Sequence, residues 1–335
     1  MGLLSIIVIN YQSSHLIHDC LNSLYRETRK TNFEIIIVDN HSADASRERL
    51  TQAFPNIIWI QMNDNAGFAR ANNQGIRHAK GDTILLLNPD TIIEGAAIDE
   101  CYEQFIYSPY IACSVQLLNP DRSPQITGNY FMTGGLNCLL PLPYLGSFLG
   151  GIAKFLGIKS PNIPDAIRPV EVDWVNGAFL MVKRHAFDKA GLMDEDFFLY
   201  AEEAEWCYRL RQTGKICLFG NIHILHLQGE TANQVFGSAG KGYYNLFNRK
   251  GLQIMLSNFV RIRKQYGIFW FLLDLMVYTI EIPVFLIGIL LSKLLFGRKA
   301  KYSFSQLIQF TGNLVTIWGL IFTIIRNRPH FYKVL

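Results

Sequence analysis

The first ninety residues alternate between short apolar runs and longer amphipathic stretches. Unbroken, largely β-branched runs predict buried strands at residues 3–10, 34–39, 57–61 and 83–87. Apolar residues at helical spacing predict helices between them, over residues 14–29, 43–54 and 66–79. Alternation of strands and helices with short connections builds right-handed βαβ units around a parallel sheet. We therefore expect an α/β fold with a mostly parallel sheet flanked by helices.

The pattern changes after this region. Residues 117–168 are dense in proline and glycine, which predicts an irregular, partly apolar insertion. Regular structure is expected again over residues 170–182, followed by a helix over 201–212 and a strand near 216–219. A further helix beyond Lys241 leads into an apolar C-terminal tail.

The tail contains two apolar runs, residues 268–296 and 307–325. The second has no charged residue and is long enough to cross a bilayer, whereas the first contains Asp274 and Glu281 on one helical face. A spanning hairpin would place the basic cluster at 298–301 across the membrane, against the positive-inside rule. We therefore favour helices that lie in the cytoplasmic leaflet with basic residues on anionic headgroups. A spanning hairpin and an oligomerisation core remain alternatives.

Composition narrows the class of protein. Half of the 335 residues are hydrophobic and 17% are charged, which excludes a disordered chain. The net charge of +4 is too small to indicate a nucleic-acid partner. None of the six cysteines forms a CxxC pair, so we expect reduced, buried thiols. The first apolar run lacks the basic region of a signal peptide, which predicts a catalytic part in the cytoplasm.

Polar residues follow the predicted strands of the N-terminal part. Ligands of parallel α/β sheets bind outside the carboxyl ends of the strands. The residues at those ends are Asn10–Tyr11, Asp39–Asn40, Asn63–Gly67 and Asn88–Asp90. Fold constraints alone do not require this convergence, so it indicates a binding site. No GxGxxG sequence follows the first strand, which excludes the usual dinucleotide fingerprint.

Two acids at these ends are candidates for binding a nucleotide and a metal. Asp39 could accept the imide N–H of uracil or thymine, or bind ribose hydroxyls, but it could also cap the following helix. Asp90, in Asn-Pro-Asp, could hold Mg²⁺ or Mn²⁺ while diphosphate oxygens complete the coordination shell. The alternative for Asp90 is a plain turn.

Three acids and one histidine in the second half are further candidates. Glu202, Glu203 and Glu205 crowd one predicted helix start, where acids favour the helix dipole and Glu205 can pair with Arg209. Mutual repulsion would raise one pKa, which suits a general base, and Glu203 projects away from the other two. His226 is either structural or a metal ligand through its imidazole.

Taken together, these motifs resemble those of family 2 inverting glycosyltransferases with a GT-A, Rossmann-like fold. The resemblance extends from about Ser5 to Arg249 and is strongest to the rhamnosyltransferase-like branch that builds bacterial surface polysaccharides. The motifs that carry it are Ser5-Ile-Ile-Val-Ile-Asn-Tyr, Ile37-Val-Asp-Asn-His-Ser, Asn63-Asp-Asn-Ala-Gly-Phe-Ala-Arg-Ala-Asn-Asn-Gln-Gly, Leu87-Asn-Pro-Asp-Thr, Val175-Asn-Gly-Ala-Phe-Leu-Met-Val and Phe198-Leu-Tyr-Ala-Glu-Glu-Ala-Glu-Trp-Cys.

The resemblance implies a role for each matching residue. Glu203 matches the catalytic base, and Asp90 and His226 match the ligands of Mg²⁺ or Mn²⁺. The substrate-binding candidates are Asn10, Tyr11, Asp39, Asn65, Gly67, Phe68, Asn73, Asn88, Asn176, Gly177, Glu202 and Arg249. Asn88 stands where the DxD motif has its first Asp, and Glu203 stands where Asp is more usual. The absence of a QxxRW motif argues against the processive cellulose- and chitin-synthase types.

The expected reaction is transfer of a sugar, with dTDP-rhamnose the favoured donor and UDP-sugars next. The apolar tail points to a membrane-held saccharide acceptor, for which a polyprenyl-diphosphate-linked saccharide is the natural candidate. We expect a GT-A domain over 1–258, with a nucleotide-sugar half (1–116), the insertion (117–168) and an acceptor half (169–258), and membrane-associated helices over 259–335. The alternatives are an inactive nucleotide-sugar binding protein and a sugar-1-phosphate nucleotidyltransferase. The sequence does not predict the oligomeric state.

Overall fold

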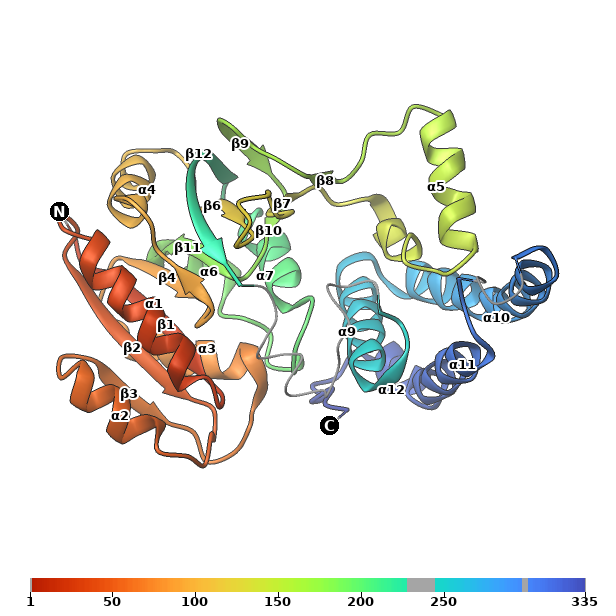
Figure 1. Ribbon diagram of the computed structural model, residues 1–335, viewed down its shortest axis with the longest axis horizontal. Coiled ribbons are helices and arrows are strands. Elements are labelled where there is room, and N and C mark those ends of the chain that lie inside the picture. Colours follow the sequence, from red (N-terminus) through yellow and green to blue (C-terminus); the bar gives the residue numbers. More distant parts are fainter. Residues whose placement is uncertain (1, 228–244, 297–300, 335) are drawn as a thin grey trace. The chain divides into compact units, whose positions relative to one another are not determined.

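The computed structural model describes residues 2–227, 245–296 and 301–334, and the chain divides into two units (Figure 1). The first unit comprises Met1–Tyr130, Asn162–Phe198 and Glu202–Ala232. The second comprises Phe131–Pro161, Leu199–Ala201 and Asn233–Leu335. This division differs from the expected boundary at residue 258, because the segment from Phe131 to Pro161 groups with the C-terminal helices.

A mixed sheet forms the centre of the first unit. Its order is β3-β2-β1-β4-β11-β6-β12-β5, with β9 paired to β12. The bounds are β1 Leu4–Asn10, β2 Phe33–Asp39, β3 Ile58–Gln61, β4 Thr83–Leu87, β5 Thr91–Ile92, β6 Ala112–Leu118, β9 Pro169–Val172, β11 Phe179–Lys183 and β12 Ile216–His226. Strands β1 to β4 are parallel, as predicted, whereas β11 runs antiparallel to both β4 and β6. A small second sheet has the order β10-β7-β8 (Trp174–Val175, Gly128–Asn129, Asn162–Ile163).

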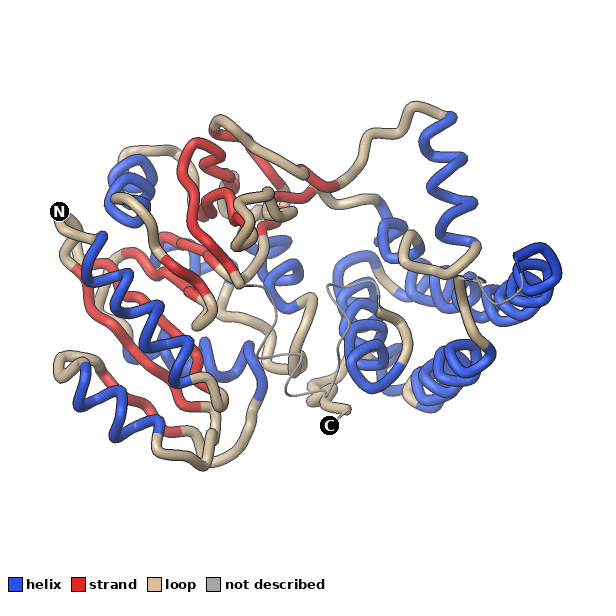
Figure 2. The backbone as a smooth tube through the Cα atoms, viewed as in Figure 1, coloured by secondary structure: helices blue, strands red, loops and turns tan. Residues whose placement is uncertain are grey.

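Helices cover both faces of the large sheet (Figure 2). The helices of this unit are α1 Ser14–Glu27, α2 Ser46–Ala53, α3 Gly67–His78, α4 Ala97–Ile106, α6 Phe187–Ala190 and α7 Glu202–Leu210, with a short 3₁₀ turn η2 at Arg184–Ala186. Alternate residues of β1 enter two different cores: Ile6 belongs to the core that includes residues of α1, α2 and α4, and Ile7 to the core that includes residues of α3 and α7. Burial on both faces explains why β1 is an unbroken apolar run.

The second unit is helical, and it differs from the sequence-based predictions for the insertion and for the second apolar run. Its elements are η1 Thr133–Leu139, α5 Leu145–Phe155, α9 Asn248–Tyr266, α10 Ile268–Phe296, α11 Phe304–Gly319 and α12 Ile321–Arg326. The insertion predicted to be irregular therefore contains η1 and α5. The second apolar run is divided between α11 and α12, so it is not one bilayer-spanning helix. Among the described residues, the stretch Ile268–Leu295 of α10 is the one helix long and apolar enough to cross a membrane.

Candidate functional site

The carboxyl ends of β1 and β2 place Asn10 directly beside Asp39. The Asp39 carboxylate is buried and accepts from Asn10 Nδ2 (2.5 Å) and Ser42 Oγ (2.5 Å) at Oδ1. At Oδ2 it accepts from Ser42 N (3.0 Å) and Gln61 Nε2 (2.6 Å). Each oxygen therefore has two donors, which uses the acceptor capacity of the carboxylate. Because Gln61 is the exposed donor, an incoming imide N–H would reach Asp39 by displacing it.

The asparagine-rich segment after β3 shapes the start of α3. Asn40 links to this segment by donating from Nδ2 to Asn65 Oδ1 (3.0 Å), and Phe68 N donates to the carbonyl of Phe198 (2.8 Å). Gly67 has φ +80°, and a Cβ there would lie 2.2 Å from the Phe198 carbonyl oxygen. Only glycine satisfies both conditions. The half-buried Tyr11 lies in the bend that follows β1.

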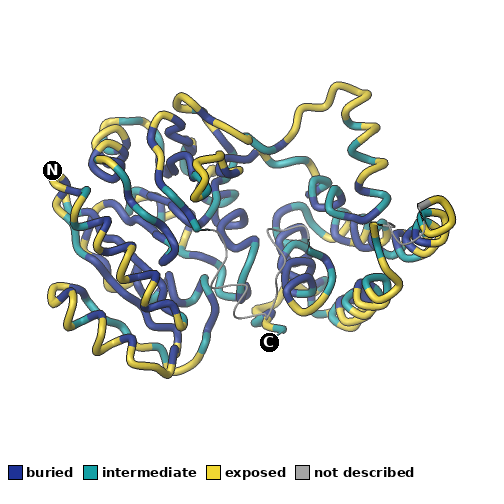
Figure 3. Tube along the Cα trace, in the orientation of Figure 1, coloured by how far each residue is buried: buried dark blue, intermediate teal, exposed yellow. Residues whose placement is uncertain are grey.

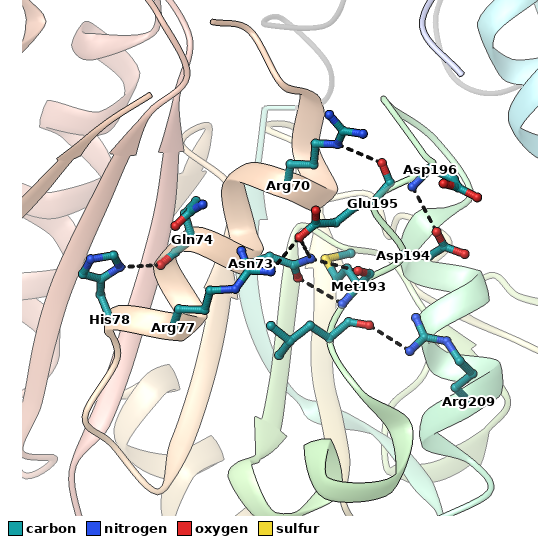
Figure 4. A network of polar contacts seen from close by, with 11 residues as sticks. Arg70, Asn73, Gln74, Arg77, His78, Met193, Asp194, Glu195, Asp196 and Arg209 are labelled. Atoms are coloured by element: carbon teal, nitrogen blue, oxygen red, sulfur yellow. Dashed lines mark hydrogen bonds and ion pairs between the residues drawn. The ribbon is translucent and has the colours of Figure 1, made fainter. Parts of the chain in front are cut away.

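Three side chains of α3 hold the segment that leads into α7 (Figure 4). The buried Asn73 donates to Met193 O (2.9 Å) and to Glu195 Oε1 (3.0 Å), and it accepts from Met193 N (3.0 Å). Arg77 donates to Glu195 Oε1 (2.7 Å) and Arg70 donates to Glu195 O (2.9 Å). These contacts give Asn73 a positioning role, because its amide is engaged within the protein.

The pairing of β5 with β12 brings Asp90 and His226 together. His226 lies opposite Thr91 in the register, and the main chain of Leu227 donates to Asp90 O (2.9 Å). Asp90 is 4% exposed and His226 is 5% exposed. The distance from Asp90 Oδ1 to His226 Nε2 is 3.4 Å. Both predicted metal ligands thus lie side by side in a buried position.

The buried Gln125 determines which nitrogen of His226 faces Asp90. Gln125 Nε2 donates to His226 O (2.7 Å) and to Asn119 Oδ1 (2.9 Å), so its Oε1 accepts from His226 Nδ1 (2.9 Å). Nδ1 therefore carries a proton, and Nε2 is the nitrogen that faces Asp90. Nε2 is buried without a hydrogen-bond partner among the described residues. A buried imidazole nitrogen beside a carboxylate suits a divalent cation, so these residues fit Mg²⁺ or Mn²⁺.

Asp90 and His226 alone would leave most of a coordination shell open. Within the described ranges, no group of three or more His, Cys, Asp or Glu side chains has the spacing of a metal site. Mg²⁺ commonly binds through one or two protein ligands, with phosphate oxygens and water completing the shell.

No sequence motif indicates Gln125, which lies in the segment expected to be irregular. We expect Gln125→Leu to weaken Mn²⁺ binding by about 10–100-fold, because hydrogen-bond partners of ligand histidines contribute that much. Electron paramagnetic resonance of free Mn²⁺ measures the affinity. Gln52→Leu, at an exposed position of α2, is the matched control. Equal affinities for Gln125→Leu and the wild type would contradict the role given to Gln125.

The buried Glu203 lies against two other motif segments. A Cβ at Gly177 would be 3.5 Å from Glu203 Cβ and 3.7 Å from Phe68 Cε1. Ala178, the next residue, accepts at its carbonyl from Asn88 N (2.9 Å), and Asn176 Oδ1 caps this turn through Ala178 N (2.9 Å). The structure therefore connects the candidate base to the strand end that carries Asp90.

Glu205 has the structural role predicted for it. Its carboxylate forms a two-point ion pair with Arg209 (2.7 and 2.8 Å), and Arg209 also donates to the carbonyls of Ala190 and Leu192. Burial and the charge of the neighbouring Glu203 raise the pKa of Glu202 well above its usual range. The proximity of the two carboxyl groups therefore disfavours a second negative charge at this point of α7.

The raised pKa of Glu202 makes a prediction about stability. A carboxyl whose pKa is higher in the folded state destabilises the fold as the pH rises above its unfolded pKa. We expect Glu202→Gln to raise the melting temperature at pH 8, and this gain to shrink towards pH 4. Calorimetric unfolding scans at several pH values measure it. A gain that is larger at acid pH would contradict the direction of the pKa shift.

Some predicted residues lie outside this group. Arg249 is exposed in the first turn of α9, which belongs to the second unit. The residues that follow Leu227, up to Tyr244, lie outside the described residues, as do Arg298 and Lys299 of the middle basic cluster.

Comparisons with known proteins agree with the motifs. Residues 5–156 match the protein family described as Glycosyl transferase family 2. The low-salt glycan biosynthesis hexosyltransferase Agl10 of Haloferax volcanii is 28% identical over 309 residues, covering 89% of this chain and 87% of that protein. The N-acetylglucosaminyl-diphospho-decaprenol L-rhamnosyltransferase of Mycobacterium tuberculosis is 23% identical, covering 67% of this chain and 75% of that protein. Rhamnosyltransferase WbbL of Escherichia coli is 25% identical, covering 66% of this chain and 83% of that protein.

Solved structures share the fold. The mannosyltransferase PcManGT from Pyrobaculum calidifontis superposes with a TM-score of 0.53 at 13% identity, covering 97% of this chain and 84% of that one. GalNAc-T7 gives a TM-score of 0.51 at 14% identity, covering 68% of this chain and 44% of that one. The family match favours sugar transfer over the nucleotidyl transfer considered from the sequence. The chain is a glycosyltransferase, and its residues 5–156 match the family 2 domain.

Proposed function

We propose that the protein is an inverting glycosyltransferase that moves L-rhamnose from dTDP-rhamnose to a membrane-held saccharide. One observation carries this proposal: His226 Nε2 is buried without a partner among the described residues and lies 3.4 Å from Asp90. Hydrogen bonds and packing connect this pair, through Asn88 and Gly177, to Glu203. A pair that can bind a cation suits the side of the leaving diphosphate in a substitution reaction. A buried acid joined to it in this way suits the side of the attacking hydroxyl.

Asp90 and His226 would bind a divalent cation together with the diphosphate of the donor. Such a cation neutralises the negative charge that develops on the departing diphosphate. Two structural neighbours support this assignment, because PcManGT was solved with GDP-mannose and Mn²⁺, and GalNAc-T7 with UDP and Mn²⁺. The tautomer fixed by Gln125 keeps the Nε2 lone pair available for the cation.

Glu203 acts on the acceptor. Its carboxylate takes the proton of the attacking hydroxyl while that oxygen forms a bond to the anomeric carbon. The bond from this carbon to the diphosphate oxygen breaks on the opposite face, so the configuration inverts. The protonated Glu203 then releases its proton to water.

The donor is assigned from base recognition and from relatives. Asp39 and Gln61 together offer an acceptor and an amide at the strand ends, which suits the imide edge of thymine or uracil. The dTDP-rhamnosyl transferase RfbF of Shigella flexneri is 22% identical over 68% of this chain, covering 73% of that protein. The acceptor is assigned by analogy with the decaprenol-linked substrate in the name of the mycobacterial relative.

A donor panel tests this function. Thermal unfolding is measured with dTDP-rhamnose, UDP-glucose and GDP-mannose, each with Mn²⁺ and with EDTA. A donor at 100 times its Kd stabilises the fold by about 2.7 kcal/mol. We expect the largest rise with dTDP-rhamnose and Mn²⁺, and loss of that rise in EDTA. A larger rise with GDP-mannose would contradict the donor assignment.

The second unit is proposed to hold the enzyme at the cytoplasmic leaflet of a membrane. Leu290, Leu291, Leu294 and Leu295 at the end of α10 are exposed, and α11 adds exposed Ile308 and Trp318. Scattered exposed apolar residues are ordinary on soluble proteins, but an extended apolar surface of this kind marks an interaction site. Membrane binding would bring the enzyme to a lipid-linked acceptor.

A further inference from the structure

We propose that α5 is an additional membrane-binding helix, which lies in the plane of the bilayer and inserts Phe148, Ile152 and Phe155 into an anionic lipid surface. The inference rests on the membrane location proposed above and identifies a contact outside the C-terminal helices. It gives a function to a segment that the sequence indicated only as an irregular insertion.

The apolar face of α5 is exposed rather than packed against the described part of the chain. Phe148 is 64% exposed, Ile152 is 41% exposed and Phe155 is 90% exposed. Their spacing of four and three residues places them on one helical face. Leu156 and Ile158 extend the exposed apolar surface beyond the end of the helix. Figure 3 shows that α5 is largely intermediate or exposed along its length, and Gly146 is its one buried residue.

Glu281 of α10 fixes the beginning of α5. Its carboxylate accepts from Tyr144 N (2.9 Å) and Leu145 N (3.0 Å), which are main-chain donors that a helix start leaves without intrahelical partners. The Tyr144 hydroxyl lies 3.1 Å from Ser292 Oγ, and its ring packs against Phe285. The helix is therefore tethered to α10 at its start, and the end that carries Phe155 is left exposed.

The charge of the second unit selects the partner. This unit contains 15 Lys and Arg residues and two acids, Asp274 and Glu281, both of which are fully buried. The first unit has the opposite balance, with 16 basic and 25 acidic residues. Lys154 of α5 and Lys159, four residues beyond its end, are exposed. A second copy of so basic a unit would be repelled, whereas anionic headgroups attract it.

A fluorescent label on α5 tests the insertion. Phe155→Cys in the full chain is labelled with an environment-sensitive nitrobenzoxadiazole dye, because all six natural cysteines are buried. Vesicles of phosphatidylcholine are compared with vesicles that also contain phosphatidylglycerol. We expect a blue shift and a rise in emission on the anionic vesicles, and quenching by spin-labelled lipid. Tyr107→Cys, at a residue of the first unit that is 78% exposed, is the control and should show none of these changes.

Co-sedimentation of the unlabelled chain provides the second measurement. We expect the double variant Phe148→Ser/Phe155→Ser to bind vesicles with a partition constant at least about tenfold lower, because two phenyl rings no longer enter the bilayer. Tyr107→Ser should leave it unchanged. A chain that sediments with vesicles while the dye at position 155 stays in water would overturn the role of α5 alone. A chain that does not sediment would overturn the membrane location as well. A blue shift of the dye emission that grows with protein concentration in the absence of vesicles would indicate that a second copy covers α5, and would contradict the lipid partner.

Discussion

Replacing Glu203 by Gln is expected to lower the rate of sugar transfer by about 10²–10⁴-fold, the usual contribution of a general base. The amide has nearly the shape of the carboxylate, so packing against Gly177 and Phe68 persists. It lacks the basicity to take the acceptor proton. Donor affinity should stay close to the wild-type value, because the proton transfer concerns the acceptor. Initial rates and calorimetric donor titration measure the two quantities on the same preparation.

The control for this change is Glu48→Gln, the same substitution at an exposed position of α2. It should leave both rate and affinity unchanged. If Glu203→Gln and the wild type had equal kcat values, Glu203 would be removed from the catalytic role. A parallel loss of donor affinity would assign it to donor binding instead.

Asp90→Asn is expected to lower both the rate and the donor affinity, unlike Glu203→Gln, which lowers the rate alone. The amide keeps the size of the side chain but removes the negative charge that would bind a cation beside His226 Nε2. We expect donor affinity in Mn²⁺ to fall to the value that the wild-type protein has in EDTA, a loss of at least about tenfold, or 1.4 kcal/mol. Calorimetric titration of the donor in Mn²⁺ and in EDTA measures both limits.

Asp19→Asn, at an exposed position of α1, is the matched control for the loss of one charge. Its donor affinity should equal that of the wild type in both buffers. Wild-type affinity and rate that are insensitive to EDTA would argue against a cation at Asp90 and His226.

The N-terminal half of the large sheet was predictable because its signals are local. Strands β1, β2 and β4 are buried on both faces, so each is a continuous apolar run, and the helices between them carry regular apolar spacing. The polar residues at their carboxyl ends follow from the parallel order. The pairing of Asn10 with Asp39 is a direct consequence of that order.

The remainder depends on contacts between residues distant in sequence. Strand β12 continues to His226, well past the predicted end at residue 219, because a register irregularity lets it stay paired with β6 and then reach β5. The link from Gln125 to His226 joins residues 101 positions apart. Helix α5 was missed because its glycines lower helix propensity, whereas Glu281 supplies the missing cap from another helix.

Product stereochemistry tests the central claim most directly, that Glu203 and the Asp90–His226 pair serve one direct displacement. Proton nuclear magnetic resonance of the full chain with dTDP-rhamnose, Mn²⁺ and a polyprenyl-diphosphate-linked saccharide follows the anomeric signals of donor and product. We predict that the new glycosidic bond has the anomeric configuration opposite to that of the donor, and that Glu203→Gln gives almost no product. A product that retains the configuration of the donor would contradict the account.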